Sequence, residues 1–237
     1  MTKKITILGL FLIFAVSSYA QSEYISKAVE LFSRKKTAYV TLKDGTELTG
    51  TIKDLDRKKG LFEQITLADE KKKKTKIDAE DISHMYLPQN SLDKLSAAMD
   101  KMYDAQQWDN EDINMEHLKD GYAYFEQSSI QLKKKQVDVL LQLLNPAFAK
   151  PVKIYFDPYA KETASVGIGG IGVAGGNDKS YWIKVGDEVA FKLKKKDYDE
   201  NYQRLYSKCP EYIKELGDRV MWKDFGEQIY NYSQSCK

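Results

Sequence analysis

The chain has few of the residue types on which metal sites and many enzymes depend. Its 237 residues include two histidines and two cysteines, and His84 and His117 do not form an H-x-x-x-H pair. Such a composition argues against a zinc site. No G-x-S-x-G pattern is present, so a hydrolase nucleophile elbow has no anchor. We therefore predict no metal, no cofactor and no identifiable catalytic residue, and we expect His84 to be structural.

Long apolar runs are also scarce, and the one that is present lies at the amino terminus. Two lysines precede an apolar run from Ile5 to Val16, which is followed by small residues at Ser18 and Ala20. This three-part pattern is typical of a secretory signal peptide. The run is shorter than the roughly 20 residues that cross a bilayer as a helix. We expect cleavage after Ala20, export to the periplasm or the extracellular space, and a mature protein that does not span the membrane.

The charge balance changes once the predicted signal peptide is removed. The first twenty residues hold two lysines and no acidic residue, so the remaining chain carries 35 basic and 35 acidic residues. A neutral protein has no general attraction for nucleic acid. We therefore predict a protein or glycan partner in the bacterial envelope and no nucleic acid partner.

The two cysteines, Cys209 and Cys236, lie near the carboxyl end of the chain. An even number of cysteines in an exported protein favours a disulfide, and two free thiols are the alternative. A bridge would close a loop of about 28 residues, which is worth roughly 3.5 kcal/mol by the loop-entropy relation.

Residues 21–90 combine a short helical pattern with several short strands. Apolar residues at helical spacing predict a helix within residues 21–36. Asp44-Gly45 is a strong hairpin signal between two strands. Further strands are predicted by apolar and β-branched residues, and Gly50 inside the second strand indicates a bend. The predicted strands are 39–42, 47–55, 61–67, 76–77 and 82–87.

The stretch from Tyr39 to Asp56, Y-V-T-L-K-D-G-T-E-L-T-G-T-I-K-D-L-D, resembles the first motif of the Sm/LSm family. The resemblance implies a five-stranded, strongly bent SH3-like barrel over residues 37–88. The family's RNA-binding residues are not matched: Gly60 replaces an asparagine, and Ile77 to Ile82 lacks the Arg-Gly pair. The lysine run from Lys71 to Lys74 is either an anion or polysaccharide patch or a solvated hairpin tip that discourages edge pairing.

The second part of the chain mixes strands and helices. Helices are predicted over 91–107, over the leucine-rich 137–144, and at three places after Asp197, one of them starting at Pro210. Strands are predicted at 152–156, 180–185 and 188–194. The domain boundaries that we infer are a signal peptide (1–20), a barrel with an amino-terminal helix (21–90), a helix and linker (91–114) and an α+β domain (115–237). The expected fold is thus mainly β, α+β, with disulfide-linked helices at the end.

Gly167 to Gly172, G-I-G-G-I-G, satisfies the G-x-G-x-x-G pattern. A dinucleotide site needs a helix directly after the glycines, and Val173 to Asp178 has loop character instead. We interpret the glycines as allowing close packing of apolar strands, with a mobile binding loop as the alternative.

The aromatic residues Tyr155, Tyr181 and Trp182 offer a candidate ligand face. Rings of this kind stack on sugars, although they also fill cores. A glycosidase would need two carboxylates, but acidic residues are too numerous for a pair to be chosen. The sequence therefore predicts an exported, non-enzymatic binding or assembly protein of the bacterial envelope. A carbohydrate-binding protein or carbohydrate-active enzyme is the alternative.

Overall fold

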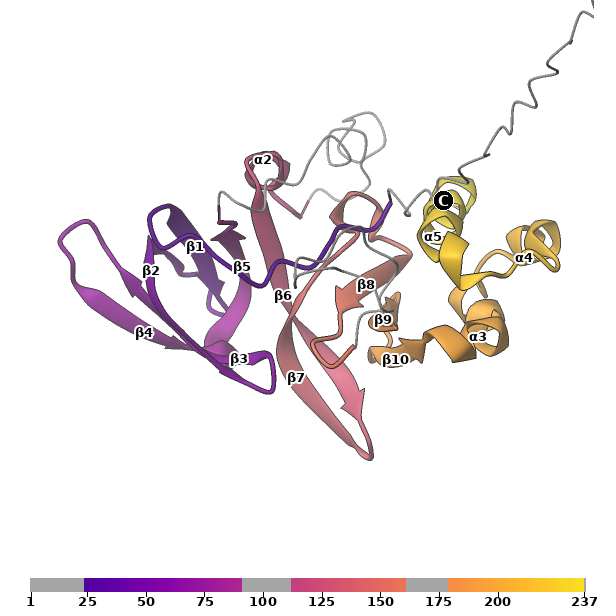
Figure 1. Ribbon diagram of the computed structural model, residues 1–237, viewed down its shortest axis with the longest axis horizontal. Helices are drawn as coiled ribbons and strands as arrows, with labels where there is room; N and C mark the ends of the chain where they lie inside the picture. Colours follow the sequence, from indigo (N-terminus) through magenta and orange to yellow (C-terminus); the bar gives the residue numbers. More distant parts are fainter. Residues whose placement is uncertain (1–23, 91–111, 161–178, 237) are drawn as a thin grey trace, which may run out of the picture.

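The computed structural model describes residues 24–90, 112–160 and 179–236, and it combines strands with a smaller share of helix (Figure 1). Three sequence predictions lie outside these residues: the signal peptide, the helix over 91–107 and the glycine motif at 167–172.

Five strands occupy residues 37–88, as predicted. They are β1 (Thr37–Leu42), β2 (Glu47–Lys58), β3 (Leu61–Ala68), β4 (Lys74–Asp78) and β5 (Ile82–Pro88), with a 3-10 turn η1 (Ala79–Asp81) before β5. The Asp44-Gly45 hairpin is confirmed. The Asp44 carboxylate accepts a hydrogen bond of 2.9 Å from the Thr46 backbone N–H, and Gly45 has a φ of +86°, which favours glycine.

Strand β2 is long and irregular. Its pairing with β3 shifts register between Ile52 and Asp54 and again between Asp56 and Arg57. Gly50 lies against the backbone of β3, where a Cβ atom would come within 2.5 Å of the Ala68 carbonyl oxygen. The glycine therefore permits the close approach of the two strands.

The sheet has seven strands, and the predicted five-stranded barrel is not what the structure shows. Strands β6 (Tyr122–Leu132) and β7 (Lys135–Gln142) extend the sheet, in the order β4-β3-β2-β1-β5-β6-β7. All neighbouring strands are antiparallel. Strand β5 pairs with β1 on one edge and with β6 on the other, so neither edge of β5 is left to close a barrel on β4. The sheet instead continues past the predicted domain boundary.

Two predicted helices are wrong. Residues 24–36 form no helix: they are irregular, with one isolated bridge from Phe32 to Gln89, because backbone N–H groups bond to the rest of the protein. Val29 donates to the Gln142 side chain (2.9 Å) and Ser26 to the Leu144 carbonyl (2.8 Å). Most of residues 137–144 form strand β7, which pairs with β6 along its length. This strand buries side chains of both odd and even positions near its end, and that pattern imitates helical spacing.

The interior contains two apolar clusters. Strand β7 packs back against β3 and η1, so the curled sheet encloses one cluster that includes Val40, Ile65, Leu87, Phe125 and Leu140. The larger cluster lies between the outer face of this sheet, a second sheet and the carboxyl-terminal helices.

The second sheet has three antiparallel strands in the order β10-β9-β8, as the sequence predicted for each segment. They are β8 (Val152–Phe156), β9 (Ser180–Val185) and β10 (Phe191–Lys194). It joins the first sheet through bridges from Leu143 to Tyr155 and from Ile130 to Ala190.

The helices lie mainly at the carboxyl end (Figure 1), where Pro210 occupies the first turn of its helix as predicted. The α-helices are α2 (Met115–Lys119), α3 (Tyr198–Leu205), α4 (Pro210–Leu216) and α5 (Phe225–Ser235). The 3-10 turns are η4 (Pro146–Phe148), η5 (Lys195–Asp197) and η6 (Trp222–Asp224). The predicted disulfide is present: Cys209 at the start of α4 is bonded to Cys236 at the end of α5. Within the described residues, none of the helices combines the length and apolar character needed to cross a bilayer.

Candidate functional site

A pocket of about 940 Å³ opens between the second sheet and the carboxyl-terminal helices, and we call it the lysine pocket. Its described lining combines basic side chains with aromatic and apolar ones. The lining residues are Tyr159, Ala160, Lys179, Ser180, Lys192, Lys194, Lys195, Lys196, Tyr198, Asp199, Val220, Met221 and Trp222.

Strand geometry brings the lysines to one side of the pocket. Side chains alternate across a strand, so Lys192 and Lys194 of β10 lie on the face opposite to Leu193, which is buried. Turn η5 continues this run with Lys195 and Lys196. Strand β9 begins beside it, because Lys194 pairs with Ser180 and the Lys195 backbone N–H donates to the Lys179 carbonyl (2.9 Å).

The opposite wall is aromatic and held rigidly. The Trp222 ring stacks on Phe225 at 5.0 Å and on Tyr181 at 5.6 Å between centroids. The Tyr198 hydroxyl donates to the Gln228 side chain (2.5 Å) and lies 2.7 Å from the Tyr206 hydroxyl. These contacts fix both rings, which are largely buried: Tyr198 is 1% and Trp222 7% exposed. The wall is therefore rigid, but it exposes little ring surface.

The rim of the pocket exposes apolar surface. Tyr159 is 41% exposed and Met221 is 43% exposed, and both are large apolar side chains of the kind that proteins usually bury. Partial burial, together with the nearby Asp157 carboxylate, raises the pKa of the Tyr159 phenol. A phenol is neutral at physiological pH even without this shift. The rim thus offers a neutral ring face beside the lysines.

The charge of one pocket lysine, Lys192, is balanced by a buried carboxylate. The buried Asp157 carboxylate lies 2.6 Å from the Lys192 ammonium and accepts a hydrogen bond of 2.6 Å from the Ser180 hydroxyl. Lys196 is 3.8 Å from Asp197 on the surface. Among the described residues, no carboxylate lies within ion-pair distance of Lys179, Lys194 or Lys195, so the pocket presents uncompensated positive charge.

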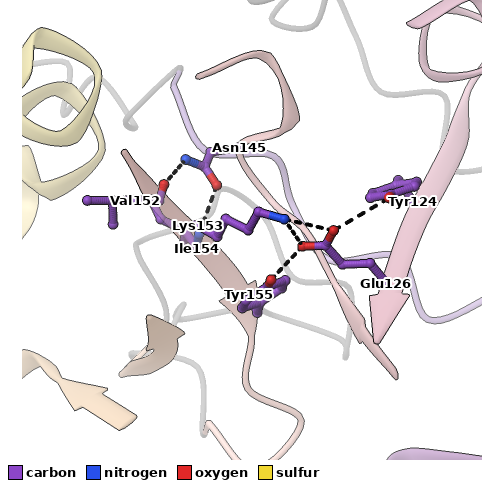
Figure 2. A network of polar contacts seen from close by, with 7 residues as sticks. All are labelled: Tyr124, Glu126, Asn145, Val152, Lys153, Ile154 and Tyr155. Carbon is purple, nitrogen blue, oxygen red and sulfur yellow. Dashed lines mark hydrogen bonds and ion pairs between the residues drawn. The ribbon is translucent and has the colours of Figure 1, made fainter. Parts of the chain in front are cut away.

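A second polar cluster lies between the two sheets (Figure 2). Glu126 of β6 accepts hydrogen bonds from the Lys153 ammonium (2.7 and 2.9 Å) and from the Tyr155 hydroxyl (2.5 Å), and the Tyr124 hydroxyl lies 3.5 Å away. Burial and the Glu126 charge raise the pKa of Tyr155 well above its usual range. Tyr155 therefore remains a hydrogen-bond donor. The cluster satisfies its own charges and ties β6 to β8, which is a structural role.

The aromatic ligand face predicted from the sequence does not form. Tyr155, Tyr181 and Trp182 are 0%, 3% and 2% exposed, because all three are packed in the core. Tyr155 and Trp182 are cross-strand partners on one face of the second sheet, whereas Tyr181 lies on the other face, against Trp222. Trp182 lies behind the pocket, where the Lys192 ammonium is 5.9 Å from its ring centroid. The exposed ring is Tyr159, three positions beyond the end of the run V-K-I-Y-F. The sequence signal that was overlooked is the basic stretch K-L-K-K-K at 192–196.

Both histidines belong to an aromatic row across β1, β5 and β6. The His117 ring stacks on Tyr39 at 4.2 Å, and His84 packs edge-on against Tyr86 at 6.0 Å. Burial lowers the pKa of His84. In the part of the chain that the structure describes, no cluster of three or more His, Cys, Asp or Glu side chains could hold a metal ion.

The lining of the lysine pocket is suited to holding an anion that also has a ring or an apolar part. Lysines supply the charge, the exposed Tyr159 supplies ring surface, and Asp199 is the one carboxylate among the described lining residues. Comparison of the chain with protein-family models, curated proteins and solved structures finds no match.

Proposed function

We propose that the chain is an exported binding protein that holds an anionic ligand in the lysine pocket and acts without catalysis. The observation that carries this proposal is the convergence of five lysines on a pocket whose other wall is aromatic and fixed. Positive charge on a concave surface concentrates anionic ligands and speeds their association.

Export is supported by the predicted signal peptide and by the disulfide. Bonds between cysteines form and persist in oxidising compartments such as the periplasm and the cell exterior. The Cys209–Cys236 bond closes the helical unit that forms one wall of the pocket, so an oxidising compartment would also stabilise the site.

A binding role is favoured over catalysis by the chemistry of the lining. Glycoside hydrolysis requires two carboxylates that face the same bond. Asp199 is the one carboxylate among the described lining residues, and Asp157 behind the wall is already engaged by Lys192 and Ser180. The one serine of the described lining, Ser180, is engaged in the same way: it is 4% exposed, and its hydroxyl donates to Asp157.

An acidic saccharide combines the two kinds of surface that the pocket offers. Sugar rings stack on aromatic side chains, and carboxylate or sulfate groups pair with lysine. The exposed Tyr159 ring beside Lys192, whose ammonium is 5.8 Å from the ring centroid, supports this choice over a simple inorganic anion. The carbohydrate-binding alternative that the sequence predicts therefore narrows to acidic sugars.

The first five strands remain a candidate SH3/Sm-like unit that contributes to assembly. The support is a run of five short antiparallel strands in the order β4-β3-β2-β1-β5, with an irregular second strand that contains a tightly packed glycine. The pairing of β5 with β6 is a departure from a separate barrel.

Titration calorimetry with sucrose octasulfate, a compact anionic sugar, tests the proposed function. We expect binding at low salt that weakens as salt is added, since exposed charges are screened. The double variant Lys194→Glu/Lys195→Glu should lower the affinity about tenfold or more, because it reverses two pocket charges. Lys71→Glu/Lys73→Glu changes the net charge equally in the remote β3–β4 turn and should leave the affinity unchanged. Absence of binding, or equal binding of uncharged sucrose, contradicts the proposal.

A further inference from the structure

The lysine pocket is connected to a turn of the first sheet through Tyr159 and Pro158. Tyr159 on its rim follows Pro158, and Pro158 packs against Gly60 in the turn between β2 and β3. The contact is close: a Cβ atom at Gly60 would lie 2.5 Å from the Pro158 Cβ, and Gly60 has a φ of +84°. Glycine is therefore required at position 60 for two reasons: its positive φ is unfavourable for other residues, and a side chain there would collide with Pro158.

The same turn carries a cation that nothing neutralises among the described residues. Lys58 is 3.3 Å from Glu63, and Arg57 packs over the ring of Phe62 at 4.5 Å. Lys59, by contrast, is exposed and has a φ of +51° at the tip of the turn. It is adjacent in the chain to Gly60, as Tyr159 is to Pro158.

Chain geometry limits how far apart these two side chains are. Consecutive Cα atoms are about 3.8 Å apart. The Cα atom of Lys59 is therefore this distance from that of Gly60, and the Cα atom of Tyr159 is this distance from that of Pro158, and Gly60 and Pro158 are in contact. The basic surface of the pocket is thus continued beyond Tyr159 by another lysine on a separate element. A ligand confined to the pocket would leave this cation unused.

We propose that the lysine pocket is one end of a longer path for an acidic polysaccharide, which runs past Tyr159 and Pro158 to Lys59. The inference rests on the proposed function, because it assigns the class of ligand and its extent to the same pocket. A polymer whose negative charges recur along its length can meet the pocket lysines and Lys59 together, and the second contact is then made at high effective concentration.

The chemistry favours a polysaccharide over nucleic acid. The chain without its predicted signal peptide is neutral, whereas nucleic-acid surfaces are strongly basic. One exposed ring, Tyr159, lies on the path, and single-stranded nucleic acids are held by series of stacked rings. Single-stranded DNA is therefore included as a competing polymer in the test.

Binding of heparin oligosaccharides of two lengths tests the path, with the full protein and its matched variants. We expect the dodecasaccharide to bind more tightly than the disaccharide. Lys59→Glu should weaken the dodecasaccharide about three- to tenfold and leave the disaccharide unchanged, as reversal of one exposed charge predicts. Lys59→Gln should give a smaller effect in the same direction. Lys71→Glu is the control, because the β2–β3 and β3–β4 turns lie at opposite ends of β3.

The outcomes separate the two proposals. If both oligosaccharides bind equally, or Lys59→Glu weakens both to the same extent, the path is refuted and the pocket proposal stands. If the unaltered protein binds neither oligosaccharide, both the path and the pocket proposal are refuted. Tighter binding of a single-stranded DNA dodecamer than of the dodecasaccharide refutes the assignment of a polysaccharide.

Discussion

The Asp157 carboxylate, which has no exposed surface, lies 2.6 Å from the Lys192 ammonium in the wall of the lysine pocket. The same carboxylate oxygen accepts a hydrogen bond from Ser180, and the other accepts one from the Tyr159 backbone N–H at 3.1 Å. One buried side chain therefore holds a lysine, a serine and the start of the rim in place.

Replacing Asp157 by asparagine should destabilise the protein. The variant keeps the size of the side chain but removes the charge that Lys192 faces, and buried pairs are costly to break. Because the Lys192 side chain is 29% exposed and can reach water, we expect a loss of about 1–3 kcal/mol in the free energy of unfolding. Urea unfolding measures it. Asp187→Asn, in the exposed turn between β9 and β10, is the control, and an equal effect of both variants contradicts the prediction.

Asn145→Ala should cost more stability than the removal of a surface asparagine. Asn145 is fully buried, and its side chain donates to the Val152 carbonyl (2.8 Å) and accepts from the Ile154 N–H (2.8 Å), as Figure 2 shows. Alanine leaves both backbone groups buried without these partners, which should cost about 2–4 kcal/mol. Asn114→Ala removes an exposed helix cap and should cost about 1 kcal/mol. Denaturant unfolding of the two variants side by side would falsify the ranking if Asn114→Ala were the more damaging.

Alkaline pH should weaken the fold through its buried tyrosines. Burial raises the pKa of Tyr155, Tyr198 and Tyr206, and burial with the nearby Glu215 charge raises that of Tyr212 to about 12. The folded state then binds protons that the unfolded state releases above its tyrosine pKa of about 10. Stability is therefore fully present below about pH 10 and falls as pH rises toward the folded-state values.

Unfolding in urea at several alkaline pH values, together with tyrosinate absorbance, checks this dependence. Tyr212→Phe removes one of the raised groups and its hydrogen bond to the Gln228 carbonyl (2.7 Å). The variant should be less stable at neutral pH but should lose stability less steeply above about pH 10. An unfolding free energy that stays constant up to about pH 12 is the contrary result.

Removing the disulfide should loosen the helices that form one wall of the lysine pocket. Cys209 and Cys236 are 27 positions apart, and by the loop-entropy relation the bridge is worth about 3.5 kcal/mol. The double variant Cys209→Ala/Cys236→Ala should lose roughly this amount in calorimetric unfolding, and the unaltered protein should lose as much under a reductant. If the variant and the oxidised protein unfold at the same temperature, the bridge contributes nothing to stability.

Sequence reasoning located the strands well where turn residues and alternation agreed. Asp44-Gly45 and Gly186-Asp187 both lie in hairpin turns, at which their glycines have positive φ. Such local signals act within a few residues, so no knowledge of the remaining fold is needed. The disulfide was predictable for a similar reason, since two cysteines allow one intrachain pairing.

The errors arose where distant contacts decided the outcome. Residues 24–36 have helical spacing, but the bond from the Val29 N–H to Gln142, 113 positions away, holds the segment against strand β7 in an irregular conformation. Isolated short helices are marginal, so such a contact prevails. The end of β7 is buried on both faces, and its periodicity therefore could not distinguish a strand from a helix.

The candidate site could not be assembled from the sequence because it is a product of packing. The basic stretch 192–196 is visible, yet nothing local places it opposite Trp222 or beside Tyr159. The predicted ligand face included Tyr155, which is fully buried, and not Tyr159, which is 41% exposed. Tyr155 lies within β8, which is buried between other elements, whereas Tyr159 lies in the turn after the strand, so packing decides which ring faces the solvent.

The pairing of β5 with β6 has a consequence for any chain cut between Asn90 and Asp112. Met85 and Phe125 are partners in this ladder, and Leu87 and Phe125 both belong to the apolar cluster that the curled sheet encloses. The two pieces would thus share one interior and hold each other by backbone hydrogen bonds. The protein should behave as a complementing pair of fragments, each incomplete alone and able to rebuild the whole when mixed with the other.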